Sequence, residues 1–202
     1  MGQKNKLKSM EALTKLSSLL SKNSTILDIG AGETQIHSNM FRNTGFKVDT
    51  VDFFKNSTYI GDFNKVEIPI QYDAVWASHC LEHQLNVNIF LKKIVKVTKV
   101  GGFVAITVPP LKHQIVGGHV NLWNPGLLIY NMVLAGLDCS NIKIKTYGYN
   151  ISAIVQKTNV QIPFDKLCYD WPDLPILNSF FPKEITYEKN CVFDGQINQL
   201  NW

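Results

Sequence analysis

The sequence predicts an α/β protein in which helices cover both faces of a doubly wound, mainly parallel sheet. Its 202 residues suffice for one compact domain, and its fractions of hydrophobic (45%) and charged (18%) residues are ordinary for a globular chain. Short apolar runs at residues 26–29, 47–53 and 72–77 have the length of strands. Helical patterns follow them, and this alternation predicts strands joined by crossover helices.

Helical spacing of apolar residues predicts an N-terminal helix within Ser9–Ser21 and three later helices. The first crossover helix begins near Ile36 and closes at Gly45, and the second covers Val87–Val97 and ends at Gly101. Asn124 and Pro125 form an N-cap and first-turn pair, which opens a helix that stops at Gly136.

An antiparallel hairpin is predicted after the last of these helices. Residues 142–147 alternate between apolar and polar side chains, residues 148–150 are typical of a turn, and residues 151–155 return as a second strand. We therefore expect the sheet to close with an antiparallel strand.

Two glycines end the first predicted strand, at Gly30 and Gly32. Without a Cβ atom, glycine lets the backbone N–H groups of a turn approach a bound ligand closely. Asp28, near the end of the same strand, can reach a cationic or hydroxylated group. An ordinary connection between strand and helix would explain the glycines equally well, so the turn alone assigns no function.

Further acids follow the glycines in a regular order. Asp52 ends the second strand, about 20 residues later, where a carboxylate binds the ribose hydroxyls in a βαβ nucleotide site. Asp62 lies beside Phe63, a pair that can hydrogen-bond an exocyclic amine and cover an adenine face. The fourth strand then runs into Ser78 and His79. This series predicts a nucleoside-containing ligand at the carboxyl edge of the sheet.

These residues resemble the class I S-adenosylmethionine-dependent methyltransferases, in a broad branch whose fourth strand ends in a His-x-Leu-Glu-His type of sequence. The resemblance covers residues 24–157. It is carried by Ile26–Thr34, Val51–Phe53, Gly61–Phe63, Tyr72–His83, Gly101–Pro110 and Gly118–Trp123.

The resemblance implies a Rossmann-like, seven-stranded sheet in the order 3-2-1-4-5-7-6 with its last strand antiparallel. It also implies S-adenosylmethionine as the cofactor. The residues expected to bind that cofactor are Asp28, Gly30 and Gly32 at the methionine portion, Asp52 at the ribose, Phe53, Asp62 and Phe63 at the adenine, and Ser78 and His79 after the fourth strand.

Two positions depart from the family pattern. Thr34 stands where a third glycine is common, and Val100 stands where a proline often precedes the glycine pair of the fifth strand. Neither change removes a group that methyl transfer requires. Gln35 occupies the position where a Gly-x-Gly-x-x-Gly fingerprint needs glycine, which argues against a nicotinamide dehydrogenase.

The expected reaction is transfer of a methyl group to an oxygen or nitrogen of a small-molecule or sugar-like acceptor. His119 is the candidate general base, because its loop faces the acceptor in the family. His79 is a second candidate, which lines the methionine end of the cofactor or fixes the loop. His113 either joins these histidines or is exposed, and Glu82 and His83 are expected to orient the loop and cap the following helix.

Two other functions fit parts of the sequence. A methyltransferase-like partner or scaffold without catalysis would share the same motifs. His79, Glu82 and His83 also satisfy the His-x-x-Glu-His pattern of inverted zinc peptidases, which requires a helix through the segment and a third ligand. The methyltransferase interpretation includes no metal.

Charge and cysteine spacing restrict the possible partners. The net charge is +4 and the pI is about 8.8, but the lysines form no run, so the sequence carries no strong nucleic-acid signal. No apolar run is long enough for a membrane span. The four cysteines lie far apart, which predicts reduced thiols in a cytoplasmic protein.

Three regions are expected along the chain. Residues 1–23 form an N-terminal helical segment, residues 24–157 the S-adenosylmethionine-binding methyltransferase domain, and residues 158–202 an extension rich in proline and aromatic residues. The extension shows no sustained period and is expected to be irregular. It either wraps over the domain, forms a homodimer contact, or builds a lid or wall of the acceptor pocket.

Overall fold

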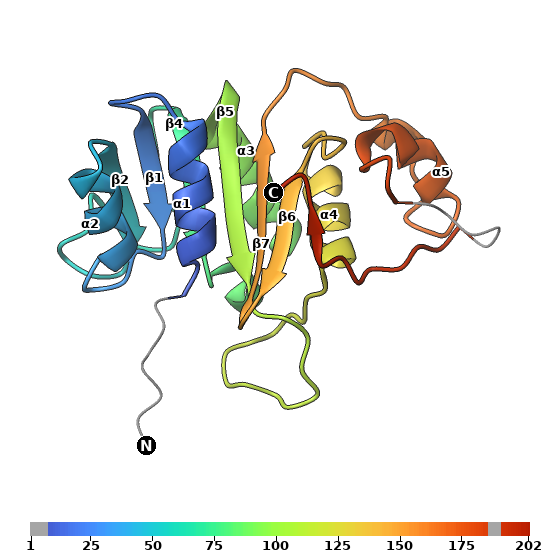
Figure 1. Cartoon of the computed structure of the whole chain (residues 1–202), viewed down its shortest axis with the longest axis horizontal. Helices are drawn as coiled ribbons and strands as arrows, with labels where there is room; N and C mark the ends of the chain where they lie inside the picture. Colours follow the sequence, from blue (N-terminus) through green and yellow to red (C-terminus); the bar gives the residue numbers. More distant parts are fainter. Residues whose placement is uncertain (1–7, 186–190) are drawn as a thin grey trace.

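The computed structural model describes residues 8–185 and 191–202 and shows an α/β fold built on one mixed sheet (Figure 1). The predicted order 3-2-1-4-5-7-6 is confirmed, and an eighth strand extends it at the edge, to β3-β2-β1-β4-β5-β7-β6-β8. The strands are β1 (Thr25–Ile29), β2 (Lys47–Asp52), β3 (Tyr59–Ile60), β4 (Tyr72–Ser78), β5 (Thr98–Val108), β6 (Lys143–Tyr147), β7 (Asn150–Gln156) and β8 (Gln199–Leu200).

Strand direction matches the prediction as well. Strands β1 to β5 pair in parallel, and β7 runs antiparallel to both of its neighbours, β5 and β6. The carboxyl ends of the parallel strands therefore meet at one edge. The long loop of residues 109–124 emerges from that edge, below the sheet in Figure 1.

Helices cover both faces of the sheet. Helices α1 and α2 lie on one face, and α3 and α4 lie on the other (Figure 1). The helices are α1 (Met10–Leu19), α2 (Ile36–Asn43), α3 (Val87–Val97), α4 (Pro125–Leu134) and the short α5 (Asp173–Leu177), with 3₁₀ turns at Leu81–His83, Phe164–Lys166 and Asn178–Phe180. The Asn124 side chain accepts a hydrogen bond from the Leu127 N–H, as predicted for the N-cap of α4.

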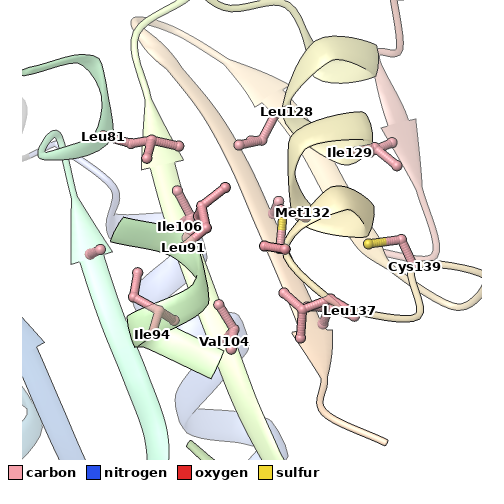
Figure 2. Packing of buried hydrophobic residues seen from close by; sticks show 14 of the residues in the cluster. Leu81, Leu91, Ile94, Val104, Ile106, Leu128, Ile129, Met132, Leu137 and Cys139 are labelled. Atoms are coloured by element: carbon pink, nitrogen blue, oxygen red, sulfur yellow. The ribbon is translucent and has the colours of Figure 1, made fainter. Parts of the chain in front are cut away.

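Alternation along the strands separates the apolar core into two parts. Figure 2 shows side chains of α3 and α4, such as Leu91 and Met132, facing Val104 and Ile106 of β5. On the other face, Trp76 of β4 packs edge-on against Phe41 of α2, with ring centroids 5.4 Å apart. Each face thus buries its own set of apolar side chains, and both sets anchor the same strands.

The range Val87–Val97 predicted for the second crossover helix is confirmed, but the prediction that Gly101 terminates it is wrong. Helix α3 ends at Val97, and Gly101 lies inside β5 with a φ of +82°. The Lys157 ammonium donates hydrogen bonds to the carbonyls of Val95 and Thr98, which satisfies carbonyl groups at the end of the helix. A cation that follows β7, far along the chain, therefore performs the capping that the sequence assigned to glycine.

The C-terminal extension is more ordered than the sequence indicates. It forms α5 and it contributes β8, which pairs with β6. Leu177 and Phe181 are buried in the core on the α4 side of the sheet, so the extension wraps over the domain. A homodimer through this region stays a prediction. Among the described residues, no helix combines the length and the apolar character needed to cross a membrane.

Replacing Phe181 with Ala is expected to lower the free energy of unfolding by about 3–5 kcal/mol, because the ring is 1% exposed and its removal leaves a cavity. Urea denaturation measures the change. Phe164→Ala is the matched control, because that ring is 37% exposed and its loss creates no enclosed cavity. Equal losses in the two variants would contradict docking of the extension on the core.

Candidate functional site

A cavity of about 240 Å³ opens at the carboxyl edge of the sheet, between the ends of β1, β2 and β4. Six of the predicted cofactor residues line it: Gly30, Asp52, Phe53, Asp62, Phe63 and His79. Sequence reasoning missed several others, namely Ile29, Val51, Gly61, Cys80, Gln84 and Phe90. Three predicted residues, Asp28, Gly32 and Ser78, do not line the cavity.

The glycine turn packs tightly against the residue that follows β4 and His79. A Cβ atom on Gly30 would lie 2.3 Å from the Cys80 sulfur, and the backbone there has a φ of +71°. Gly32 has a φ of +69° and open space where a Cβ would lie. The first glycine is therefore required by packing, and the second leaves room beside the turn.

Asp52 is held in one orientation by backbone groups. Its Oδ2 accepts a hydrogen bond from the Gly32 N–H at 2.8 Å, and its Oδ1 accepts one from the Phe53 N–H at 2.7 Å. Each carboxylate oxygen keeps a further lone pair. The Phe53 ring next to it is 75% exposed, which is unusual for so large an apolar side chain.

Asp62 and Phe63 form the neighbouring wall. Asp62 Oδ1 accepts a hydrogen bond from the Asn64 N–H at 2.9 Å, and Oδ2 lies 3.8 Å from the exposed Lys65 ammonium. Phe63 is 5% exposed and packs edge-on against Phe90, with ring centroids 5.1 Å apart. Its ring is therefore part of the core and contributes to the base of the cavity.

Asp28 lies beneath the cavity and is 2% exposed. The Ser38 hydroxyl of α2 donates a hydrogen bond to Asp28 Oδ2 at 2.5 Å, which ties β1 to α2. Burial raises the pKa of this carboxyl to about 7, and the hydrogen bond from Ser38 opposes part of that rise. The bond thus fixes the end of β1, next to the glycine turn, against α2.

Ser78 makes its side-chain hydrogen bond outside the residues that line the cavity. Its hydroxyl hydrogen-bonds the Ser9 hydroxyl, just before α1, at 2.7 Å. The bond joins the end of β4 to the start of the N-terminal helix. Ser78 thus connects two elements beside the site.

His79 adopts a left-handed backbone conformation, with a φ of +56°, directly after β4. Its Nδ1 lies 3.2 Å from Glu82 Oε1, and its Nε2 lies 3.0 Å from Asn150 Oδ1. The Tyr149 ring stacks on it at a centroid distance of 6.1 Å. Both ring nitrogens are therefore engaged with oxygen atoms of this chain.

The predicted convergence of the histidines is partial. His119 lies in the loop of residues 109–124 and packs edge-on against His83, with ring centroids 4.9 Å apart. His113 is exposed in the same loop. The segment from His79 to His83 contains a single 3₁₀ turn, and the two nitrogens of His79 are engaged as above. It therefore lacks the helix that the inverted zinc peptidase interpretation requires.

Asp28→Asn is expected to change how stability depends on pH. The carboxyl has a pKa of about 7 in the folded protein and an ordinary value of 3.8 in the unfolded chain, so the folded state binds the proton more tightly. That stabilisation is complete below pH 3.8 and is lost as pH rises through about 7, a change of roughly 4 kcal/mol. The Asn side chain does not titrate, so the variant lacks this pH dependence. Urea unfolding between pH 4 and 8 measures the free energy of unfolding of the unaltered protein and of the variant. Parallel stability curves would contradict the assignment.

Comparisons with known proteins agree with this geometry. A family model described as a methyltransferase domain matches residues 3–163. No curated protein matches the sequence.

Solved structures share the fold at low sequence identity. A putative methyltransferase of Haloferax volcanii, in complex with the Trm112 methyltransferase activator, is 14% identical with a TM-score of 0.60, covering 76% of this chain and 93% of that one. The 1,6-didemethyltoxoflavin-N1-methyltransferase of Burkholderia thailandensis, with 1,6-didemethyltoxoflavin and S-adenosylhomocysteine bound, is 15% identical with a TM-score of 0.63, covering 77% and 80%.

A third structure, an O-methyltransferase family protein from Burkholderia thailandensis, is 12% identical with a TM-score of 0.58 and covers 76% of this chain and 57% of that one. At such identities the structures show a shared fold. Membership of the family is shown by the family model, which matches most of the sequence. The chain therefore belongs to the methyltransferase domain family, with the fold of the class I S-adenosylmethionine-dependent methyltransferases.

Proposed function

We propose that this protein transfers the methyl group of S-adenosylmethionine to an oxygen or nitrogen of a small-molecule or sugar-like acceptor. The observation that carries the proposal is the orientation of Asp52 at the cavity. Its two oxygens are fixed by the N–H groups of Gly32 and Phe53, and both retain lone pairs. Such a carboxylate is ready to accept hydrogen bonds from the two adjacent hydroxyls of a ribose.

The other walls fit the remaining parts of the cofactor. The exposed Phe53 ring offers a flat apolar surface to the adenine, Asp62 offers an acceptor for its exocyclic amine, and Phe63 closes the base of the cavity. Gly30 brings backbone to the methionine portion, beside His79, and Gly32 contributes through its N–H group, which holds Asp52.

Asp28 and Ser78 contribute to cofactor binding indirectly in this proposal. Asp28 links β1 to α2, and Ser78 links β4 to the start of α1. Both bonds hold the elements whose ends form the cavity.

The cofactor supplies a methyl group activated by the positive sulfur, which becomes a thioether as the acceptor gains the methyl and loses any proton from the same atom. The chain must therefore hold the acceptor in line, exclude water and take up that proton. His119 is the candidate general base on the acceptor side, because it is partly exposed. His79, with both nitrogens engaged, is better suited to hold Glu82 and Asn150 in place.

Two of the similar structures support methylation of either nitrogen or oxygen. One is an N-methyltransferase with 1,6-didemethyltoxoflavin bound, and another belongs to an O-methyltransferase family. An inactive partner or scaffold is the weaker alternative, since Asp52 keeps the orientation that cofactor binding requires.

Asp52→Ala is expected to weaken S-adenosylmethionine binding by about 1–3 kcal/mol, because charged hydrogen bonds to the ribose are lost. Isothermal titration calorimetry measures the affinity. Asp165→Ala, at an exposed acid in the extension, is the charge-matched control and should bind as the unaltered protein does. An Asp52 variant with unchanged affinity would place the ribose elsewhere, and no binding by the unaltered protein at millimolar cofactor would refute the proposed function.

Incubation with isotopically labelled S-adenosylmethionine and a metabolite extract is expected to label a small molecule. Mass spectrometry of the product identifies the acceptor and the position of the added methyl. The Asp52→Ala protein, at a cofactor concentration that saturates only the unaltered protein, provides the control. Label recovered only in macromolecules would contradict the proposed acceptor class.

A further inference from the structure

Glu82, His83 and His119 bring three metal-binding groups together beside the cofactor cavity. One ligand atom from each lies within 4.8 Å of the others. His83 lines the cofactor cavity, and His119 lines an adjacent small cavity in the loop of residues 109–124. The cluster therefore lies at the border between the cofactor and the acceptor side.

Backbone hydrogen bonds hold the two contributing segments together. The N–H groups of Val120 and Asn121 both donate to the Glu82 carbonyl, at 2.9 and 3.2 Å. These bonds join the turn that carries Glu82 and His83 to the loop that carries His119. The approach of the three side chains thus follows from backbone pairing.

The hydrogen bond of His83 prepares its ring for a cation. Its Nδ1 lies 2.8 Å from the Gly118 carbonyl, which can only accept, so Nδ1 carries the proton. In the neutral ring the lone pair is then on Nε2, which lies 3.9 Å from Glu82 Oε1. A histidine that donates its other nitrogen to a backbone carbonyl is the usual arrangement of a metal ligand.

Glu82 supplies an independent observation. Its side chain is 0% exposed, and its Oε2 has no hydrogen-bond partner within the described part of the chain. Pairing with His79 accounts for Oε1 alone. A buried carboxylate oxygen without a partner is costly, and a bound cation would compensate it.

We propose that Glu82, His83 and His119 bind one divalent transition-metal ion. Two imidazole nitrogens and a carboxylate suit Zn²⁺ and Mn²⁺ among the first-row ions. An ion about 2.1 Å from each ligand places the ligand atoms roughly 3–3.5 Å apart, so the cluster must contract slightly. Glu82 is fixed by burial, whereas His83 is exposed and His119 is partly exposed, and these two rings can move toward it.

This part of the inference rests on the proposed function: a bound ion would narrow the chemical class of the acceptor. Three protein ligands leave positions open on the side of the acceptor, and those positions favour oxygen atoms. The acceptor would then be an oxygen-bearing molecule held by the ion, which would lower the pKa of a bound hydroxyl so that its proton passes to water. His119 would act there as a metal ligand in place of the general base.

Calorimetric titration of the untagged, chelator-treated full chain with Zn²⁺ or Mn²⁺ alone tests the site. We expect one ion per chain, and at least about 10-fold weaker binding in both His83→Ala and His119→Ala. His113→Ala, an exposed histidine of the same loop, is the control and should keep the affinity. Thermal unfolding in chelator verifies that the variants fold. No binding at millimolar metal, or equal binding by the unaltered protein and both ligand variants, would overturn the inference.

Separate measurements of metal binding and cofactor binding on the same protein distinguish this inference from the proposed function. S-adenosylmethionine binding is measured by calorimetry in the presence of chelator. Cofactor binding without metal binding overturns the metal site and keeps the methyltransferase, whereas metal binding without cofactor binding does the reverse. Once an acceptor is identified, methylation that continues unchanged in chelator would overturn the role of the ion at the acceptor.

Discussion

The hydrogen bond from the Gly32 N–H to the Asp52 carboxylate joins the ends of two neighbouring strands, and the rest of the site depends on it. A second bond, from the Gly30 N–H to the Val51 carbonyl at 2.8 Å, supports the same junction. Neither glycine carries a Cβ, and at Gly30 that space is filled by the Cys80 sulfur. The turn is thus fixed from both sides, which places Asp52 and Phe53 at the mouth of the cavity.

Two buried carboxylates near this edge, those of Asp28 and Glu82, offset the cost of burying a charge in different ways. Asp28 accepts a hydrogen bond from Ser38, and burial raises its pKa to about 7, so protonation can relieve its charge. Glu82 has His79 against one oxygen only. The first is an internal connection between β1 and α2, where no ligand is needed. The second faces two histidines, and its unpaired oxygen is the reason a cation belongs there and not at Asp28.

The sequence was sufficient for the elements whose signals are local. Strand runs, helical spacing and the Asn124 cap predicted most of the strands and helices, because each depends on neighbouring residues. The sheet order was predicted from the resemblance to the methyltransferase family. Prediction from the sequence failed for features that depend on contacts between residues far apart in the chain. Lys157, in place of Gly101, satisfies carbonyl groups at the end of α3, and β8 pairs with the edge that β6 offers. Within the site, the acids followed from strand ends, whereas the contacts of Cys80 and Gln84 depend on how separate loops pack, which no spacing reveals.

The extension and the long loop of residues 109–124 meet beside the start of α4, which gives the irregular C-terminal sequence a structural purpose. The Gly126 N–H at the start of α4 donates to the Gly195 carbonyl, and a Cβ on Gly126 would lie 2.5 Å from the Gly195 Cα. Thr146 of β6 bonds the backbone of residues 197 and 198. Residues 196–198 and Pro110 of the loop line one cavity of about 250 Å³. The buried Phe181 ring of the extension therefore helps to hold its backbone against the base of the loop that carries His119. In the proposed function, this packing limits where an acceptor can lie.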